Sequence, residues 1–197
     1  MITCYFGLPG CGKSTMLAKI AAKELKRISK GKSPYSRIFC NYYIKGCLQI
    51  KFSDLGVYDT SDSLILLDEL TLDADSRKYK DFADSSKQFF ILHRKYNCDI
   101  IYVTQQYDAV DRKIRELTSD LYYMKRAGAI TYAQRIYRRI VITQDGDIRM
   151  GYQFPKLTQI ISHPSYNLKI CLRRRYYKYF NSFEAPALQE RDWQTYN

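Results

Sequence analysis

Residues 7–14 carry the most specific chemical signal in the sequence. They read Gly-Leu-Pro-Gly-Cys-Gly-Lys-Ser and fit the G-x-x-x-x-G-K-[ST] pattern of a phosphate-binding loop. Glycines let backbone N–H groups converge on phosphate oxygens, and the helix expected next adds favourable partial charge at its N-terminus. We expect Lys13 to reach the β- and γ-phosphates of a nucleotide and the Ser14 hydroxyl to ligate Mg²⁺. The predicted nucleotide-binding residues are Gly7, Pro9, Gly10, Cys11, Gly12, Lys13, Ser14 and Thr15.

Two adjacent acids, Asp68 and Glu69, follow the apolar run Ser63–Leu67, which is typical of a buried parallel strand. Asp68 is expected to support Mg²⁺ as the aspartate of a Walker B strand does. Glu69 is expected to orient or deprotonate the water that attacks the γ-phosphate. A carboxylate in this position favours nucleotide hydrolysis, because a kinase of small metabolites has no requirement for a water-activating group here.

Two more candidates for the reaction come from the segment that leads into the next strand. Thr104 or Gln105, at the end of the apolar run Asp99–Thr104, is placed to sense the γ-phosphate, and we take Gln105 as the catalytic candidate. Arg94 ends the preceding helix and is a candidate arginine finger for a neighbouring subunit's nucleotide. The alternative for Arg94 is compensation of the helix dipole by a cation at the C-terminal end.

The spacing of apolar residues predicts the elements that must position these groups. Strands are expected at Ile2–Phe6, Ile38–Ile44, Ser63–Leu67, Asp99–Thr104 and Leu121–Met124, and helices at Ser14–Ser29, Phe82–Asn97 and Val110–Leu117. This alternation predicts an α/β fold with a mainly parallel sheet flanked by helices. An Asp-Gly turn between Arg135–Thr143 and Ile148–Phe154 predicts an antiparallel C-terminal β-hairpin appendage. We expect one domain over 1–197, with a core of about 1–126 and a hairpin and tail of about 127–197.

Composition restricts the class of protein. The 197 residues, 46% of them hydrophobic, suffice for a globular core and exclude a disordered chain. Six scattered cysteines form no CxxC pair, so we expect reduced thiols and no zinc site. No apolar run approaches the ~20 residues that a membrane-spanning helix needs, so no transmembrane helix is expected.

Charge is the unusual property of the chain, with 32 Lys+Arg against 20 Asp+Glu and a net charge of +12. Residues 59–84 hold eight acids and three bases, a local −5 around the proposed metal site, which leaves +17 elsewhere. Basic residues concentrate in 13–51, 112–139 and 169–178, the last two interleaved with tyrosines. Such surfaces suit single-stranded nucleic acid or an anionic membrane surface, and the alternative is a solvated cationic face.

The ordered set of motifs resembles the ATPase domain of the zonula occludens toxin (Zot) family, the assembly proteins of filamentous phages. The residues that carry the resemblance are Gly7–Ser14, Ile38-Phe-Cys-Asn41, Leu66-Leu-Asp68-Glu69, His93-Arg94, Asp99-Ile-Ile-Tyr-Val-Thr-Gln105 and Tyr176-Tyr-Lys-Tyr179-Phe-Asn-Ser182. The resemblance implies a P-loop NTPase of the FtsK/HerA-like additional-strand type that acts at the inner membrane. Family members usually continue into a transmembrane helix, so we expect a truncated cytoplasmic domain or attachment through another protein.

From motifs and resemblance together we expect an ATP- and Mg²⁺-dependent motor that couples hydrolysis to extrusion of single-stranded phage DNA. Its expected partners are further copies of itself in a ring, phage DNA, and phage coat and assembly proteins. Its expected location is the host cytoplasm, at the inner face of the cytoplasmic membrane. Two alternatives stay open: a nucleotide or metabolite kinase, and a non-hydrolysing module whose partner binding is gated by nucleotide.

Overall fold

The computed structural model describes residues 1–70, 84–142 and 148–180. In chain order its regular elements are β1 (Ile2–Phe6), α1 (Lys13–Ile28), β2 (Arg37–Cys40), β3 (Leu48–Gln49), β4 (Ser63–Leu67), α2 (Asp84–Leu92), β5 (Asp99–Thr104), α3 (Arg112–Leu117), β6 (Asp120–Ala127), β7 (Ile130–Ile142), β8 (Ile148–Gln153), α4 (Leu157–Ser162), α5 (Pro164–Asn167) and β9 (Leu168–Leu172). Two 3₁₀ turns follow β9, at Arg173–Arg175 and Tyr177–Tyr179.

The sheet confirms the expected α/β architecture. Its strand order is β3-β2-β4-β5-β1-β6-β7-β8, and β9 also pairs with β7. Strands β1 to β6 all run parallel to one another, whereas β7 is antiparallel to β6, β8 and β9. Strand β5 lies between β4 and β1, so it is the additional strand between the two Walker strands. The carboxyl ends of β1, β4 and β5 therefore meet at one edge of the sheet.

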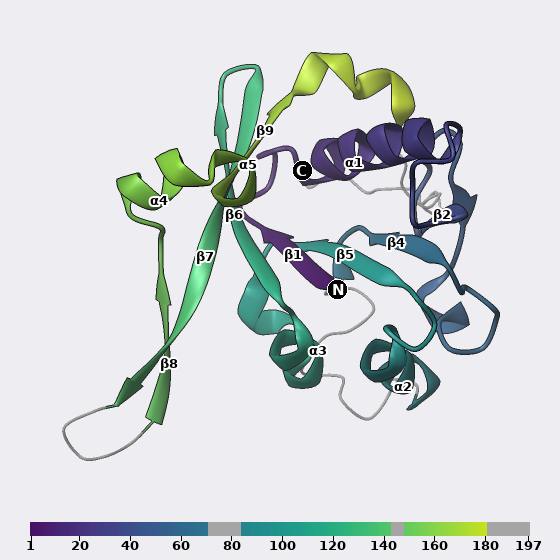
Figure 1. The fold of residues 1–197 in the computed structure, drawn as a ribbon, viewed down its shortest axis with the longest axis horizontal. Helices are drawn as coiled ribbons and strands as arrows, with labels where there is room; N and C mark the ends of the chain where they lie inside the picture. The colour runs from purple at the N-terminus through teal and green to yellow at the C-terminus, as the bar shows by residue number, and fades with distance from the viewer. Residues whose placement is uncertain (71–83, 143–147, 181–197) are drawn as a thin grey trace, which may run out of the picture.

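Helices cover both faces of the sheet, with α1 on one side and α2 and α3 on the other (Figure 1). On the α1 face, buried residues of the helix such as Met16, Leu17 and Ala21 pack with Ile38 and Leu66 of the strands. On the opposite face, aromatic and aliphatic residues of α2 and α3 pack against Ile65, Ile100 and other strand residues. Alternate side chains of the parallel strands thus enter two separate cores, which explains why these strands are apolar throughout.

Several expected boundaries are wrong; β6, for example, runs over Asp120–Ala127, beyond the expected Leu121–Met124. Strand β2 ends at Cys40 and not at Ile44, because the chain turns at Asn41 to meet the end of β4. Helix α2 ends at Leu92, short of Asn97, whose left-handed φ of 54° belongs to the turn before β5. Its expected start at Phe82 lies outside the described residues. Helix α3 begins two residues later than expected, because the Asp111 side chain accepts a hydrogen bond from the Lys113 N–H at 2.8 Å and caps it.

The C-terminal hairpin is present and longer than expected. Strand β7 starts at Ile130 and makes two hairpins, one with β6 and one with β8. The first turns at Gly128, whose φ of 56° favours glycine; this hairpin was not expected from the sequence. The second projects beyond the rest of the sheet (Figure 1), and its turn lies outside the described residues. Among the described helices, none is both long and apolar enough to cross a membrane.

Candidate functional site

The phosphate-binding loop leaves the carboxyl end of β1 and enters α1. Gly12 is the N-cap of α1, with a left-handed φ of 94°, and Gly10 has a φ of 72°. The first N–H groups of a helix have no partner within the helix, and they are ready to bind an anion here because no acid occupies the first turn. The sequence-predicted loop and helix are therefore confirmed as a strand–loop–helix unit.

Strands β6 and β7 pack closely against the phosphate-binding loop. A Cβ on Gly7 would lie 2.6 Å from the Met124 carbonyl oxygen, and one on Gly12 would lie 2.4 Å from Thr131 Oγ1. The Thr131 hydroxyl also donates a hydrogen bond to the Cys11 carbonyl at 2.7 Å. Gly7 is therefore required by the close approach of the Met124 backbone, and Gly12 by its left-handed φ and by the Thr131 side chain packed against it.

Lys13 is folded onto its own loop. Its side chain is buried, and its Nζ donates to the Gly7 carbonyl at 3.0 Å and the Leu8 carbonyl at 3.3 Å. These carbonyls are neutral acceptors, so a phosphate dianion entering the loop would offer the ammonium a stronger, charge-assisted partner.

Asp68 and Glu69 stand at the carboxyl end of β4. The Asn41 side chain, at the end of the neighbouring β2, exchanges two hydrogen bonds with the Asp68 main chain. The Asp68 carboxylate accepts from the Glu69 N–H at 3.0 Å, and Glu69 adopts a left-handed φ of 47°. Only a few per cent of residues other than glycine take such a conformation, and their strained backbone is held by surrounding contacts.

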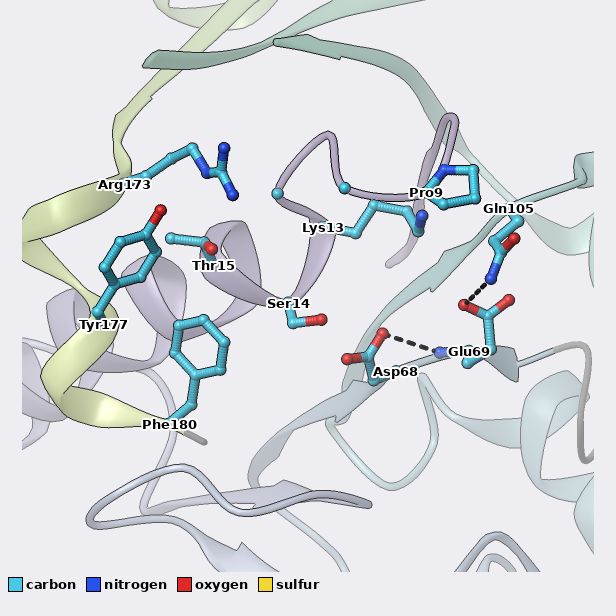
Figure 2. Close-up of a pocket in the computed structure, with 12 residues that line it drawn as sticks. Pro9, Lys13, Ser14, Thr15, Asp68, Glu69, Gln105, Arg173, Tyr177 and Phe180 are labelled. Carbon is cyan, nitrogen blue, oxygen red and sulfur yellow. Dashed lines mark hydrogen bonds between the residues drawn. The ribbon is translucent and has the colours of Figure 1, made fainter. Parts of the chain in front are cut away.

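Two polar residues at the end of β5, Thr104 and Gln105, are the candidates to sense the γ-phosphate. Gln105 Nε2 donates to Glu69 Oε2 at 3.3 Å, and both residues line the same cleft (Figure 2). The Thr104 hydroxyl is instead bonded to the main chain of Gln106, through both the N–H and the carbonyl. Of the two sensor candidates, the structure brings Gln105 to the site.

The oxygen ligands near the loop fit a magnesium ion. Burial raises the pKa of the Asp68 carboxyl above its usual value, and a hydrogen bond with the Ser14 side chain opposes part of that rise. A buried carboxylate that pays a desolvation cost is stabilised by a nearby cation. The Ser14 hydroxyl and the Asp68 carboxylate face each other across the cleft (Figure 2), and Mg²⁺ typically takes one or two protein oxygens and completes its shell with water and phosphate.

These groups line one cleft of about 780 Å³. Its walls are Pro9, Gly10, Gly12, Lys13, Ser14, Thr15, Asp68, Glu69, Gln105, Arg173, Tyr177 and Phe180. Gly7 and Cys11, predicted as nucleotide-binding, do not line it. Gly7 packs against β6, and the buried Cys11 side chain belongs to the core on the α1 face.

Sequence reasoning missed the wall made by Arg173, Tyr177 and Phe180. The mixture of cations and aromatics without acids in 169–178 predicts a surface for nucleic acid or lipid. The structure instead directs Arg173 and Tyr177 toward the cleft (Figure 2), while Arg174 and Arg175 are exposed. The pairing of β9 with β7 brings this segment to the cleft, and no local sequence pattern predicts that pairing.

Arg94 lies away from this cleft. It lines a second hollow at the opposite edge of the sheet, together with residues that begin β5 and β6, such as Asp99 and Asp120. It is exposed at the edge of the sheet opposite the phosphate-binding loop, so within one chain it does not reach that loop. Its proposed action on a neighbouring subunit stays a prediction.

The basic segment 112–139 is only partly a surface. Arg135 is buried and ion-paired with Asp120, and Arg138 donates to the main chain of Arg115 and Thr118. Tyr122 is also buried. The cations of this segment that remain exposed are Arg112, Lys113, Lys125, Arg126 and Arg139.

Comparisons with known proteins bear on the family and on the fold. The family model described as zonular occludens toxin (Zot) matches residues 15–159. The solved N-terminal domain of zonular occludens toxin from Neisseria meningitidis aligns with a TM-score of 0.57 at 15% identity, over 91% of this chain and 98% of that one. The DNA-packaging ATPase B204 of Sulfolobus turreted icosahedral virus aligns with a TM-score of 0.49 at 10% identity, over 76% of this chain and 95% of that one. Of these two, the first supports the fold. No curated protein sequence matches the chain.

Proposed function

Because the chain belongs to the zonular occludens toxin (Zot) family, we propose that it is a Mg²⁺-dependent ATPase that drives assembly and export of a filamentous phage. In this proposal, hydrolysis is coupled to extrusion of single-stranded DNA. The observation that carries the enzymatic part is the cleft at the carboxyl ends of β1, β4 and β5, where Lys13, Ser14, Asp68, Glu69 and Gln105 meet.

Each residue of the cleft has a distinct part in the proposed reaction. Lys13 leaves its loop carbonyls to bind the β- and γ-phosphates. Ser14 and Asp68 are the groups that would hold Mg²⁺, which when bound neutralises charge on the phosphate oxygens. Glu69 orients the attacking water and accepts its proton, and Gln105 reports the state of the γ-phosphate to Glu69 through their hydrogen bond.

The pair Glu69–Gln105 favours hydrolysis over transfer to a metabolite. It connects the ends of the adjacent strands β4 and β5, which lie on one side of β1 and its phosphate-binding loop, and so places a carboxylate and an amide where a water would approach the terminal phosphate. A kinase needs an acceptor molecule there instead. The kinase and the non-hydrolysing module are the outcomes that the experiment below distinguishes.

The motor part of the proposal needs assembly. Arg94 is remote from the cleft of its own chain, so a role as finger requires a neighbour in a ring. Exposed cations such as Lys125, Arg126 and Arg139 are candidates to contact DNA phosphates or, at the inner face of the host membrane, lipid headgroups. Phage coat and assembly proteins complete the proposed set of partners.

Turnover of ATP by the purified chain, with and without single-stranded DNA at several salt concentrations, tests the proposal. We expect stimulation by DNA that declines as salt rises, because phosphate contacts release counterions. Lys13→Ala should abolish turnover and binding, whereas Glu69→Gln should bind ATP and lose turnover by about 10²-fold or more. Glu116→Gln, on the exposed surface of α3, is the matched control and should behave as the wild type.

Three results would contradict the proposal in different ways. A wild-type rate in Glu69→Gln would remove its role in water activation. Transfer of phosphate to a nucleoside monophosphate with little hydrolysis would identify a kinase. Binding without turnover, even with DNA and in the assembled state, would identify a nucleotide-gated module.

A further inference from the structure

The chain after β9 forms one wall of the nucleotide cleft. Residues 173–179 make two 3₁₀ turns that run over α1 (Figure 1), and the second contacts that helix. The Arg173 N–H donates to the Ala129 carbonyl at 3.1 Å, and the Tyr179 carbonyl accepts from the Lys45 N–H at 2.8 Å. The wall is therefore tied to the β6–β7 turn at one end and to the chain that follows β2 at the other.

Aromatic contacts connect this wall to the start of α1. The buried Phe180 ring meets Tyr42 edge-on at 6.5 Å between centroids, and Tyr177 at 6.4 Å. The Tyr42 hydroxyl donates to the Ser14 carbonyl at 3.0 Å. Phe180 is thus fixed in the core, whereas Tyr177 beside it lines the cleft and keeps 47% of its surface exposed.

Arg173 lies against the phosphate-binding loop itself. Its Nε is 3.4 Å from the position that a Cβ on Gly12 would occupy. The same Nε is buried and has no hydrogen-bond partner within the described part of the chain. Its guanidinium carbon is 5.8 Å from the centre of the Tyr177 ring. A cation is therefore placed between the loop and an aromatic ring, with a donor that lacks an acceptor.

The cleft has a direction. Glu69 and Gln105 stand at one end, Lys13 and Ser14 lie between, and Thr15 stands with Arg173, Tyr177 and Phe180 at the other (Figure 2). A nucleotide whose γ-phosphate meets Glu69, as the proposed function requires, must extend its α-phosphate toward Thr15 and its base toward Tyr177. An aromatic face suits any base, because every base has a π-face to stack on it.

We propose that Tyr177, supported by Phe180, stacks on the base of the bound nucleotide, and that Arg173 binds the phosphate nearest the ribose. The inference rests on the proposed function for the direction of the nucleotide in the cleft. It assigns the base-side subsite to a C-terminal segment far in sequence from the phosphate-binding loop.

The test compares two ligands, ATP and inorganic tripolyphosphate, each titrated with Mg²⁺ by calorimetry into the wild type and its variants. Tyr177→Ala should weaken ATP binding by about 10-fold or more, as loss of stacking predicts, and leave tripolyphosphate binding unchanged. Tyr177→Phe should restore ATP binding. Arg173→Ala should weaken both ligands, whereas its exposed neighbour in Arg174→Ala should weaken neither. Circular dichroism should show the same fold in every variant.

Failure of the inference is separable from failure of the function. If Tyr177→Ala binds ATP as the wild type does, or loses ATP and tripolyphosphate equally, the base subsite is wrong, while ATP turnover by the wild type keeps the proposed function intact. If Arg173→Ala changes neither affinity, the phosphate contact is wrong. If the wild type binds neither ligand, both the subsite and the proposed function are overturned.

Discussion

Asn41 holds the main chain of Asp68 from both sides. Its Nδ2 donates to the Asp68 carbonyl at 2.9 Å, and its Oδ1 accepts from the Asp68 N–H at 2.7 Å. The amide therefore joins the end of β2 to the end of β4, at the residue where the candidate metal ligand begins its turn into Glu69. Asn41 is a positioning residue, because it acts on the acids through their backbone.

Removing this amide should slow turnover more than it weakens binding. We expect Asn41→Ala to lower kcat for ATP by about 10- to 100-fold, the range for lost support of a metal ligand, with KM changed only a few-fold. Gln49→Ala, an exposed amide on the neighbouring β3, is the matched control and should leave both constants unchanged. If Asn41→Ala changed kcat and KM no more than Gln49→Ala does, the positioning role would be contradicted.

The hydroxyl of Thr131 should matter for stability and for nucleotide affinity together. Thr131→Val keeps the side-chain volume but leaves the Cys11 carbonyl without its buried donor, which costs about 1–3 kcal/mol. Chemical unfolding should measure that loss, and calorimetry should show weaker ATP binding. Thr131→Ser keeps the hydroxyl and should recover most of both. A Thr131→Val protein as stable as the wild type would show that the bond is dispensable.

Arg94 is testable by mixing variants. Arg94→Ala should bind ATP normally, because Arg94 lies away from its own cleft. It should lose turnover in the assembled protein, because the proposed finger acts on the neighbouring subunit's nucleotide. Adding Lys13→Ala subunits, which keep Arg94 but bind no nucleotide, should restore part of the turnover. Lys95→Ala is the neighbouring exposed cation and serves as control. Unchanged turnover in Arg94→Ala would contradict the finger role; compensation of the α2 dipole is no alternative, because α2 ends at Leu92 with no basic residue in its last turn.

His93 should make the protein less stable in acid. The ring is 5% exposed, its Nδ1 is 2.8 Å from the Phe90 carbonyl oxygen, and burial lowers its pKa below the usual 6.5. The neutral form is therefore favoured when folded, so as pH falls below about 6.5 the unfolded chain binds a proton that the native state does not. Stability should fall with that titration, by at most about 1.4 kcal/mol per pH unit from this group.

Urea unfolding at pH 7.5 and pH 5.5 measures this contribution. His93→Gln removes the titrating group, so its loss of stability between the two pH values should be smaller than that of the wild type. His163→Gln, at an exposed position, should keep the wild-type pH dependence. Identical pH dependence in all three proteins would contradict the assignment.

The parts of the fold that sequence predicted best are the strands that carry the site. The structure has β1, β4 and β5 at the bounds expected from the sequence, because each is a short apolar run buried on both faces. The residues at their carboxyl ends were therefore expected together, and they line one cleft. Strand β2 was predicted too long, because β-prone residues continue in the sequence as far as Ile44. The strand ends earlier, where the Asn41 side chain bonds to the Asp68 main chain.

The segment after the C-terminal hairpin could not be predicted from the local sequence pattern. Strand β9, Leu168–Leu172, is short and places Lys169 beside apolar residues, so its pattern resembles a cationic surface. Its position is set by antiparallel pairing with β7, a contact between residues about forty positions apart that only the folded chain reveals. Tyr122 was counted among the tyrosines of a basic surface that could bind nucleic acid. It instead stacks on Tyr5 inside the core, where no ligand can contact it.

The contact of Thr131 with the phosphate-binding loop also bears on how the domain is divided. A boundary near residue 126 is natural on the sequence, but it separates the loop from the hydroxyl that fixes it and from the strand against which Gly12 packs. A fragment that ended there would expose the inner side of the loop to water and lose the aromatic wall of the cleft. A chain that keeps every wall of the cleft thus extends at least to Phe180, and strand β7 belongs to the structure that supports the phosphate-binding loop.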